Sequence, residues 1–215
     1  MYVLGPGVQF PPPELAGEDG FLAIGGKLDP EWLLLAYSNG IFPWYNDDEP
    51  ICWWSPDPRF VLFPGELNIS KSMKAALRSG RFRFTTDTSF SSVIRHCATI
   101  SRKGQEGTWI NANLLEAYIR MHELGHAHSA ETWFNDQLVG GLYGVRVGNI
   151  FFGESMFSLV PNASKFAFIN YVALLMKENI RLIDCQVYTS HLQSLGARMI
   201  PRADFLRIIK ADIGA

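Results

Sequence analysis

The sequence predicts an α+β protein, with a small N-terminal domain at residues 1–58 and a larger domain containing a central mixed sheet at residues 59–215. Three observations support this prediction. The chain of 215 residues is 47% hydrophobic and 19% charged, which is typical of a folded protein with a sizeable core. Prolines exclude a helix from residues 41–58, so the small domain should end near residue 58. Strand-like and helix-like patterns then alternate along the chain.

In the N-terminal part, local signals predict an extended path followed by one helix. Three consecutive prolines, Pro11 to Pro13, predict that the first ~20 residues form a loop with an extended path. Asp29 is suited to cap a helix, Pro30 to occupy its first position, and Gly40 to end it.

The remaining elements follow from periodicity and from residues that start or stop helices. Ser70 predicts the start of a basic helix that Gly80 ends. Turn signals at Asn135-Asp136 and Gly148-Asn149 divide a β-rich stretch into strands. In order, we expect a strand at 60–68, helices at 71–80 and 88–100 on either side of a strand at 81–87, a helix at 112–125, strands across 128–158, a helix at 162–179, a strand at 180–187, and mixed elements after 190.

Composition narrows the functional classes. The formal net charge of −2 gives no overall positive field, so a nucleic-acid partner would need a local basic patch. Three widely spaced cysteines suggest neither a disulfide framework nor a cysteine zinc site, and favour the reducing cytoplasm. No apolar run approaches the ~20 residues of a membrane helix, so we expect no membrane partner.

One stretch matches the H-E-x-x-H signature of zinc peptidases through His122, Glu123 and His126. That chemistry needs both histidines on one helix, so that they point at the same metal. Gly125 is the favoured residue just past a helix end, which would place His126 at the start of a strand. Glu131 or Glu154 could be suggested as a further ligand, but neither lies on an obvious second helix. We therefore predict no metal site and keep a zinc metallopeptidase as a disfavoured alternative.

The order strand, strand, helix, strand across residues 129–187 is similar to the core of the acyl-CoA N-acetyltransferases. Those enzymes bind pyrophosphate with a glycine-rich loop at a helix N-terminus. Here the corresponding junction, SLVPNASKFAF, contains no glycine. The sequence thus predicts an acetyltransferase-like domain that uses an acyl donor other than CoA.

Several segments between about Gly25 and Pro201 carry a more specific resemblance: GIFPW, WWSPDPR, GTWI, MHELGHAHS, LVGGLYGV, FFGESMFS, NASK and LIDCQV. Together they resemble the bacterial leucyl/phenylalanyl-tRNA–protein transferases. The resemblance implies transfer of Leu or Phe, and also Met, from aminoacyl-tRNA to the α-amine of proteins that begin with Arg or Lys, which marks them for degradation. It implies no metal and no cofactor, neither ATP nor CoA. We further expect a monomer.

The resemblance assigns catalysis to Asp184 and Gln186. The two residues lie two positions apart on a predicted strand, so their side chains should face the same side. Asp184 could act as a base or orient the amine, or could instead be a structural cap at a strand end. A cationic acceptor side chain needs a carboxylate, for which Glu154 is the first candidate; its alternative is an exposed glutamate at a strand end.

Large apolar residues should hold the donor side chain, and aromatic residues should stack on the terminal adenosine. By resemblance the first set is Leu142, Phe151, Met156, Phe168 and Tyr171, and the second is Trp44 and Trp109. Each apolar residue could equally be plain core. Five basic residues without an intervening acid could bind tRNA phosphates or form a solvated helix face: Lys71, Lys74, Arg78, Arg81 and Arg83. The patch alone would suit a non-catalytic tRNA-binding module. Thr189 stands where family members have Asn.

Overall fold

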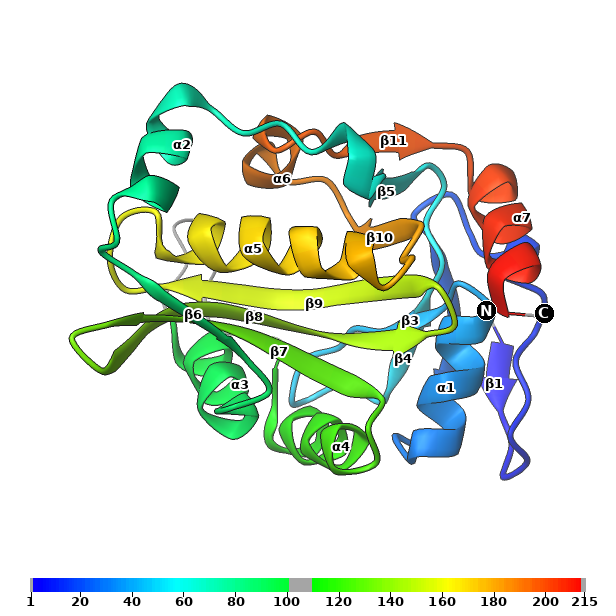
Figure 1. Cartoon of the computed structure of the whole chain (residues 1–215). Coiled ribbons are helices and arrows are strands. Elements are labelled where there is room, and N and C mark those ends of the chain that lie inside the picture. Colours follow the sequence, from blue (N-terminus) through cyan, green and yellow to red (C-terminus); the bar gives the residue numbers. More distant parts are fainter. Residues whose placement is uncertain (1, 101–109, 214–215) are drawn as a thin grey trace.

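The computed structural model describes residues 2–100 and 110–213, in which a large sheet lies between helices (Figure 1). The strand order of this seven-stranded sheet is β11-β5-β10-β9-β8-β7-β6. β9 and β10 are parallel, whereas every other neighbouring pair is antiparallel, so the predicted mixed sheet is confirmed. The strands are β5 (Arg59–Leu62), β6 (Arg83–Thr86), β7 (Ala127–Phe134), β8 (Gln137–Val147), β9 (Ile150–Ser158), β10 (Leu182–Gln186) and β11 (Arg198–Ile200).

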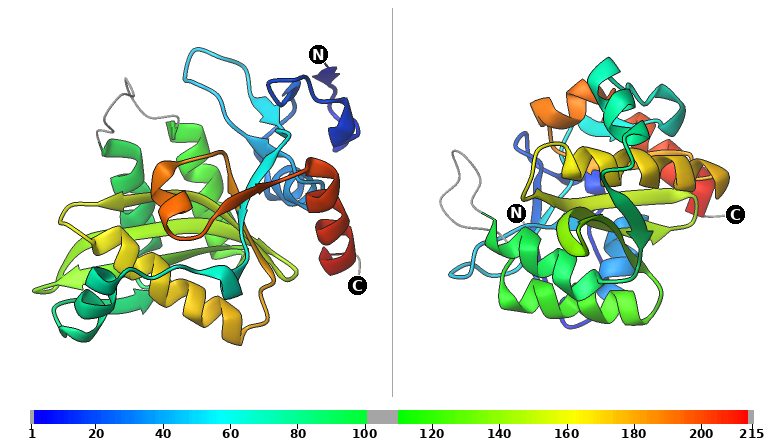
Figure 2. Two further views of the ribbon diagram at one scale, coloured as in Figure 1. Left: turned by 90° about the horizontal axis from the view of Figure 1, so that it is seen from above. Right: turned by 60° about the vertical axis from the view of Figure 1, so that its left-hand side comes forward.

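Helices cover both faces of this sheet (Figures 1 and 2). α5 (Ala163–Lys177) lies on one face, and α3 (Phe90–Thr99) and α4 (Ala112–Glu123) lie on the other. α5 is apolar nearly all round because the sheet and α2 (Lys71–Arg78) both contact it. The helix predicted at 162–179 is thereby confirmed within the usual error of helix ends.

A second, four-stranded sheet in the order β1-β2-β4-β3 forms in the N-terminal part. We expected the first ~20 residues to be loop, but β1 pairs in parallel with β2, a tertiary partner that no local pattern announces. Buried residues of α1 share one hydrophobic cluster with residues of the large sheet, so the two parts of the chain do not have fully separate cores. The domain division at residue 58 stays a prediction. The elements are β1 (Tyr2–Leu4), a short 3₁₀ helix (Pro13–Leu15), β2 (Phe21–Gly25), α1 (Pro30–Ser38), β3 (Phe42–Pro43) and β4 (Cys52–Trp54).

Ser70 and the Asn135-Asp136 turn act as predicted, whereas Asp29 precedes α1 without making a side-chain capping hydrogen bond. The Ser70 hydroxyl accepts a hydrogen bond of 3.2 Å from the Met73 N–H and so caps α2. Asn135 and Asp136 adopt positive φ angles of 49° and 56° in the β7–β8 hairpin, where such a tight turn needs them. The chain ends with α6 (Ser190–Ser194), β11 and α7 (Arg202–Ile213), and a second 3₁₀ helix covers Pro64–Glu66. Within 2–100 and 110–213, no helix is both long enough and apolar enough to cross a membrane.

Candidate active site

A cavity of about 500 Å³ opens where the two parallel strands of the sheet separate. β9 and β10 pair only between Ile150–Phe152 and Leu182–Asp184, and β9 then continues to Ser158 without this partner. The gap is lined by residues of β3, β8, β9, α5, β10 and the segment that leads into α6. Residues from both sheets thus meet at one cavity.

The cavity wall is mostly apolar and contains most of the residues expected to hold the donor. Trp44, which is 39% exposed, lines the cavity from the chain just after β3. Tyr171 does not line it: this residue is buried on α5 and packs edge-on against Phe151, with ring centroids 5.1 Å apart. The structure thus places Tyr171 behind the cavity wall, and its role in donor binding stays a prediction; Trp109 lies outside the described residues. The predicted apolar residues that do line the cavity are Leu142, Phe151, Met156 and Phe168.

Glu154 lies in the middle of β9, where its carboxylate lines the cavity and accepts three hydrogen bonds. The Tyr37 hydroxyl donates to Oε1 at 2.7 Å and the Tyr118 hydroxyl donates to Oε2 at 2.8 Å. The Gln186 amide also donates to Oε1, at 2.7 Å. The two phenol oxygens are themselves 2.6 Å apart. Glu154 is thus no exposed glutamate at a strand end, but a carboxylate held by α1, α4 and β10.

Burial controls the electrostatics of this carboxylate. It raises the pKa of Glu154 from 4.5 to about 7, against the donated hydrogen bonds of Tyr37, Tyr118 and Gln186, which lower the pKa. Burial, and then the nearby Glu154 charge, raise the pKa of both phenols well above 10.0, so the two hydroxyls stay protonated donors. A cation that entered the cavity would favour the ionised carboxylate.

Asp184 and Gln186 do not face the same side as expected from simple alternation. The register of β10 against β5 shifts between them, and Gln186 has a left-handed φ of +62°. Gln186 consequently lines the cavity, while Asp184 is fully buried and does not line it. The bulge is the physical reason, since one irregular residue interrupts the period-two rule.

Sequence reasoning missed Arg59, Tyr37 and Tyr118. The Arg59 side chain is fully buried and pairs with both carboxylate oxygens of Asp184, with Nε–Oδ1 at 2.8 Å and Nη2–Oδ2 at 2.6 Å. An arginine at the start of an apolar strand signals a buried charge that needs a partner, but it does not identify that partner. The tyrosines gave no signal, because each occupies an apolar position of an ordinary helix.

Thr189 also lines the cavity, and its hydroxyl accepts a hydrogen bond of 3.2 Å from the Leu192 N–H at the start of α6. An Asn side chain can cap a helix in the same way. Thr189 therefore supplies a helix cap that an Asn at this position could also supply.

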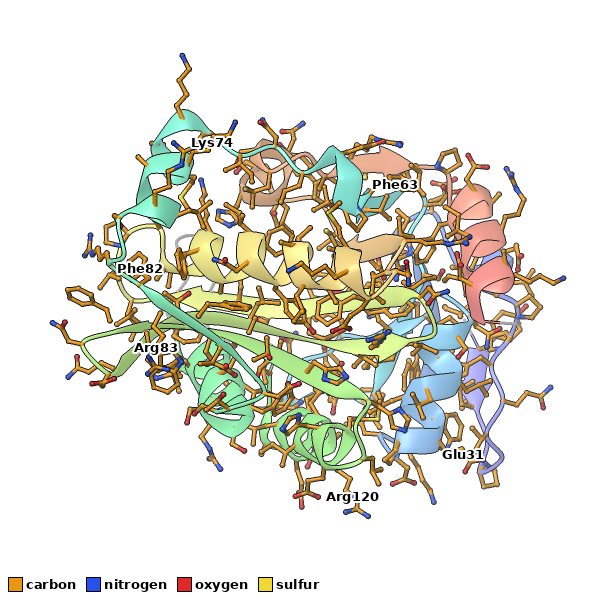
Figure 3. The ribbon with its side chains drawn as sticks, in the orientation of Figure 1. Glu31, Phe63, Lys74, Phe82, Arg83 and Arg120 are labelled. Atoms are coloured by element: carbon orange, nitrogen blue, oxygen red, sulfur yellow. The ribbon has the colours of Figure 1, made fainter. Side chains whose placement is uncertain are left out.

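The five basic residues are exposed on α2, on the segment that follows it and on β6, and none of them lines the cavity. Lys74 projects from α2 into solvent, and Arg83 lies on the neighbouring strand (Figure 3). Arg81 lies over the rings of Phe82 and Phe134, with its Cζ 5.0 Å from each centroid. We call Lys71, Lys74, Arg78, Arg81 and Arg83 the basic patch.

The zinc-peptidase motif is broken by the helix end that its glycine predicts. α4 ends at Glu123, and Gly125 has a left-handed φ of +80°. The N–H of Gly125 then donates to His122 O, and that of His126 donates to Met121 O, both at 2.9 Å. This is the hydrogen-bond pattern that turns a chain away from a helix axis, so the two histidines do not stack on one helix. The prediction that a helix end separates His122 from His126 is confirmed.

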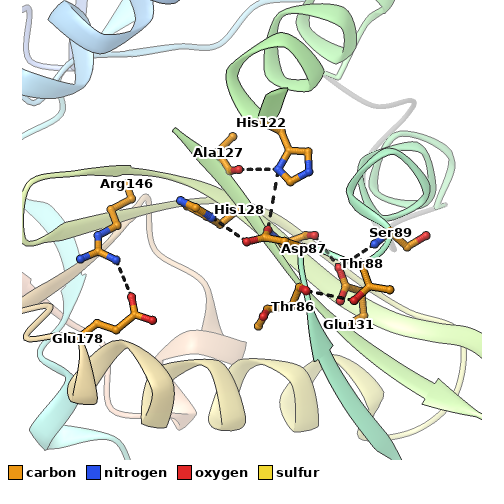
Figure 4. Close-up of polar contacts among 11 residues, drawn as sticks. Thr86, Asp87, Thr88, Ser89, His122, Ala127, His128, Glu131, Arg146 and Glu178 are labelled. Carbon is orange, nitrogen blue, oxygen red and sulfur yellow. Dashed lines mark hydrogen bonds and ion pairs between the residues drawn. The ribbon is translucent and has the colours of Figure 1, made fainter. Parts of the chain in front are cut away.

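The histidines around this motif have local partners (Figure 4). His122 Nδ1 lies 2.8 Å from the carbonyl oxygen of Ala127, and its ring stacks on Phe90. His128 Nδ1 lies 2.8 Å from Asp87 Oδ2. Among residues 2–100 and 110–213, no group of three or more His, Cys, Asp and Glu side chains is arranged to hold a metal ion.

Comparison with known proteins gives matches along nearly the whole chain. A family profile described as leucyl/phenylalanyl-tRNA protein transferase matches residues 61–210, and the profile of its N-terminal domain matches residues 26–57. The leucyl/phenylalanyl-tRNA–protein transferase of Flavobacterium johnsoniae is 55% identical over 211 residues, covering 98% of this chain and 100% of the relative. The enzyme of the same name from Syntrophus aciditrophicus is 56% identical over 210 residues, covering 98% and 88%.

Solved structures with a similar arrangement are more distant. They include a GCN5-related N-acetyltransferase-like protein from Streptococcus suis, which is 10% identical with a TM-score of 0.39 over 83% of this chain and 67% of that chain. Another is a GCN5-related N-acetyltransferase from Kribbella flavida, which is 8% identical with a TM-score of 0.38 over 80% and 61%.

Proposed function

The chain belongs to the leucyl/phenylalanyl-tRNA–protein transferase family, and from this premise we propose that it transfers Leu or Phe, and also Met, from aminoacyl-tRNA to the α-amine of proteins that begin with Arg or Lys. The observation that carries the proposal is the cavity, in which an apolar wall adjoins the Glu154 carboxylate and the Gln186 amide. The aminoacyl ester is already activated, so peptide-bond formation requires mainly positioning and proton handling.

The apolar wall is the site for the donor side chain. Phe151 and Leu142 are nearly fully buried and give it a fixed shape, whereas Met156 is only partly buried. Methionine adapts its shape easily, which suits a site that takes both Leu and Phe. Such a wall discriminates by only ~1–3 kcal/mol per methylene. Trp44 at the rim is the platform for the terminal adenosine, with Trp109 as the second candidate.

Glu154 is the site for the acceptor. Among residues 2–100 and 110–213, its carboxylate is the one acidic group that lines the cavity. A guanidinium or ammonium group would supply the positive charge that favours its ionised form. The three donors on Glu154 fix the carboxylate in one orientation, so the charge recognises a cation at a defined place.

The reaction itself moves one proton. A free α-amine has a pKa of ~8, so much of it is protonated at neutral pH. The amine must lose this extra proton before it can attack the ester carbonyl. The new N–C bond forms, the C–O bond to the ribose breaks, and the proton lost by the nitrogen is finally carried by the ribose oxygen of the released tRNA. Gln186 lines the cavity and can orient the amine by hydrogen bonding. Asp184, which does not line the cavity, accepts a hydrogen bond from the Gln186 backbone N–H.

The basic patch is the site for tRNA phosphates outside the cavity. All five of its residues are exposed, and the Arg81 guanidinium packs against two aromatic rings. A cytoplasmic location and a monomeric state complete the proposal, the first because the donor, aminoacyl-tRNA, is a cytoplasmic substrate.

A transfer assay tests this function. The protein is incubated with Phe-tRNA that carries label on the amino acid, together with a peptide that begins with Arg. We expect label on the peptide, and none on a matched peptide that begins with Asp. If tRNA binds but label never reaches the Arg peptide, the chain is a tRNA-binding module and the proposal fails.

A further inference from the structure

Arg59 is a fully buried guanidinium held between parts of the chain that are far apart in sequence. It opens β5, and its Cζ lies 4.7 Å from the ring centroids of both Phe42 and Phe205. Both oxygens of Asp184 on β10 accept its hydrogen bonds. A bidentate ion pair of this kind fixes both the position and the orientation of the carboxylate.

The Asp184 carboxylate, fixed in this way, holds the backbone of Gln186, which lies two residues further along the chain. Asp184 Oδ1, which faces Arg59 Nε, also accepts a hydrogen bond of 2.9 Å from the Gln186 N–H. That residue has a φ of +62°, which a side chain other than glycine adopts only when its surroundings favour it. The bulge and the bond from Asp184 are such surroundings.

The conformation of Gln186 decides what its side chain reaches. With this backbone the amide lines the cavity and donates to Glu154 Oε1 at 2.7 Å. Asp184 itself has no exposed surface and does not line the cavity. Both of its oxygens are engaged by Arg59, and one of them also by Gln186.

We propose that Arg59 is a positioning residue for the transfer reaction: through Asp184 it holds Gln186 in the left-handed conformation that aims its amide at the reacting groups. This inference rests on the proposed function. Asp184 accordingly takes no proton from the amine and touches no substrate. The chain Arg59–Asp184–Gln186 supplies geometry only.

The rival explanation is that the pair only stabilises the fold. Replacing a buried ion pair by apolar residues of similar volume is often neutral or stabilising, so the pair can be removed without unfolding the protein. The first double variant is therefore apolar, Arg59→Met with Asp184→Leu, which deletes the acceptor of the Gln186 N–H. The matched second double variant is polar but uncharged, Arg59→Gln with Asp184→Asn, which keeps an oxygen at that position.

The measurements are thermal unfolding, and kcat and KM for transfer from Phe-tRNA to an Arg-starting peptide, with wild type alongside. We expect both variants to fold. The apolar pair should lose about a hundredfold in kcat with little change in the KM for Phe-tRNA, because a small displacement of a positioning group costs that much. The polar pair should recover most of the loss, since the bond to the Gln186 N–H is restored.

Each other outcome decides against the proposal. Wild-type kcat in a folded apolar pair means that Arg59 and Asp184 serve the fold alone. An equally deep loss in both folded pairs means that the Asp184 charge itself takes part in the reaction. If a pair fails to fold, Arg59→Lys replaces it, since it keeps the charge but not the two-pronged contact, and wild-type kcat in that variant overturns the proposal. Absence of transfer by wild type would reject the proposed function instead.

Discussion

The Tyr37 hydroxyl lies 2.7 Å from Oε1 of Glu154, although the two residues are 117 positions apart in the sequence. Tyr37 belongs to α1, which is flanked by strands of the small sheet, whereas Glu154 belongs to the large sheet. The N-terminal part therefore contributes a side chain to the candidate active site and does not merely adjoin it.

Tyr37→Phe should weaken acceptor binding. Without this donor the ionised form of Glu154 loses a stabilising hydrogen bond, so its pKa should rise further above its ordinary value. The KM for an Arg-starting peptide at neutral pH should increase, while the KM for Phe-tRNA should change little. Tyr171→Phe is the control, because that tyrosine lies behind the cavity wall. Equal KM values in wild type and Tyr37→Phe would contradict the assigned role.

Glu154→Gln should change how stability depends on pH. An acid whose pKa is higher in the folded protein holds its proton more tightly there, so its contribution to stability falls as the pH rises from about 4.5 to about 7 and is then constant. The Glu154→Gln variant has no titrating group at this position, so its stability does not fall for this reason. Its free energy of unfolding relative to wild type should therefore increase over that window, on the order of 3 kcal/mol. Urea titrations across the window measure it, and parallel curves would show that Glu154 titrates normally.

Lys74→Glu should weaken tRNA binding and flatten its dependence on salt. Each phosphate contact contributes roughly 0.7–0.9 to the slope of log K against log salt, because binding releases counterions. Arg120→Glu is the control: Arg120 is also exposed, but it lies on α4, at the opposite edge of the molecule from Lys74 (Figure 3). A salt slope unchanged by Lys74→Glu would remove this residue from the tRNA site.

Met156→Phe should shift donor preference from Phe towards Leu. The larger ring reduces the space in the apolar cavity, and Phe needs more of that space than Leu does. The ratio of kcat/KM for Phe-tRNA and Leu-tRNA should change by roughly tenfold or more. Met176→Phe, at a half-exposed position on α5 outside the cavity, should leave the ratio unchanged. A constant ratio in both variants would place the donor side chain elsewhere.

Arg59→Met alone should destabilise the fold by roughly 3–5 kcal/mol, because it leaves the buried Asp184 carboxylate without its partner. Adding Asp184→Leu should recover much of this loss, since no uncompensated charge then remains. Chemical denaturation of the single and double variants measures the coupling. Additive effects would show that the two side chains do not stabilise one another.

Much of the fold could be predicted because its signals are local. Ser70 caps α2, Asn135-Asp136 makes the β7–β8 turn, and Gly125 ends α4 before His126. Each depends on the conformational preference of one or two residues and their immediate neighbours. The same kind of signal excluded the zinc-peptidase geometry. β1 was missed, because a three-residue strand exists only through its pairing with β2.

By itself, then, the sequence determined the family, the order of the main elements of the larger domain and several of the cavity-lining residues, because these follow from motifs, from periodicity and from the family resemblance. Only the tertiary structure decided which charges meet. It brought Arg59 to Asp184 and two tyrosines to Glu154, and it turned Gln186 away from the face of Asp184. The reason is physical: hydrogen bonds and ion pairs act over a few ångströms of space, which the folded chain sets and the spacing of residues along it does not.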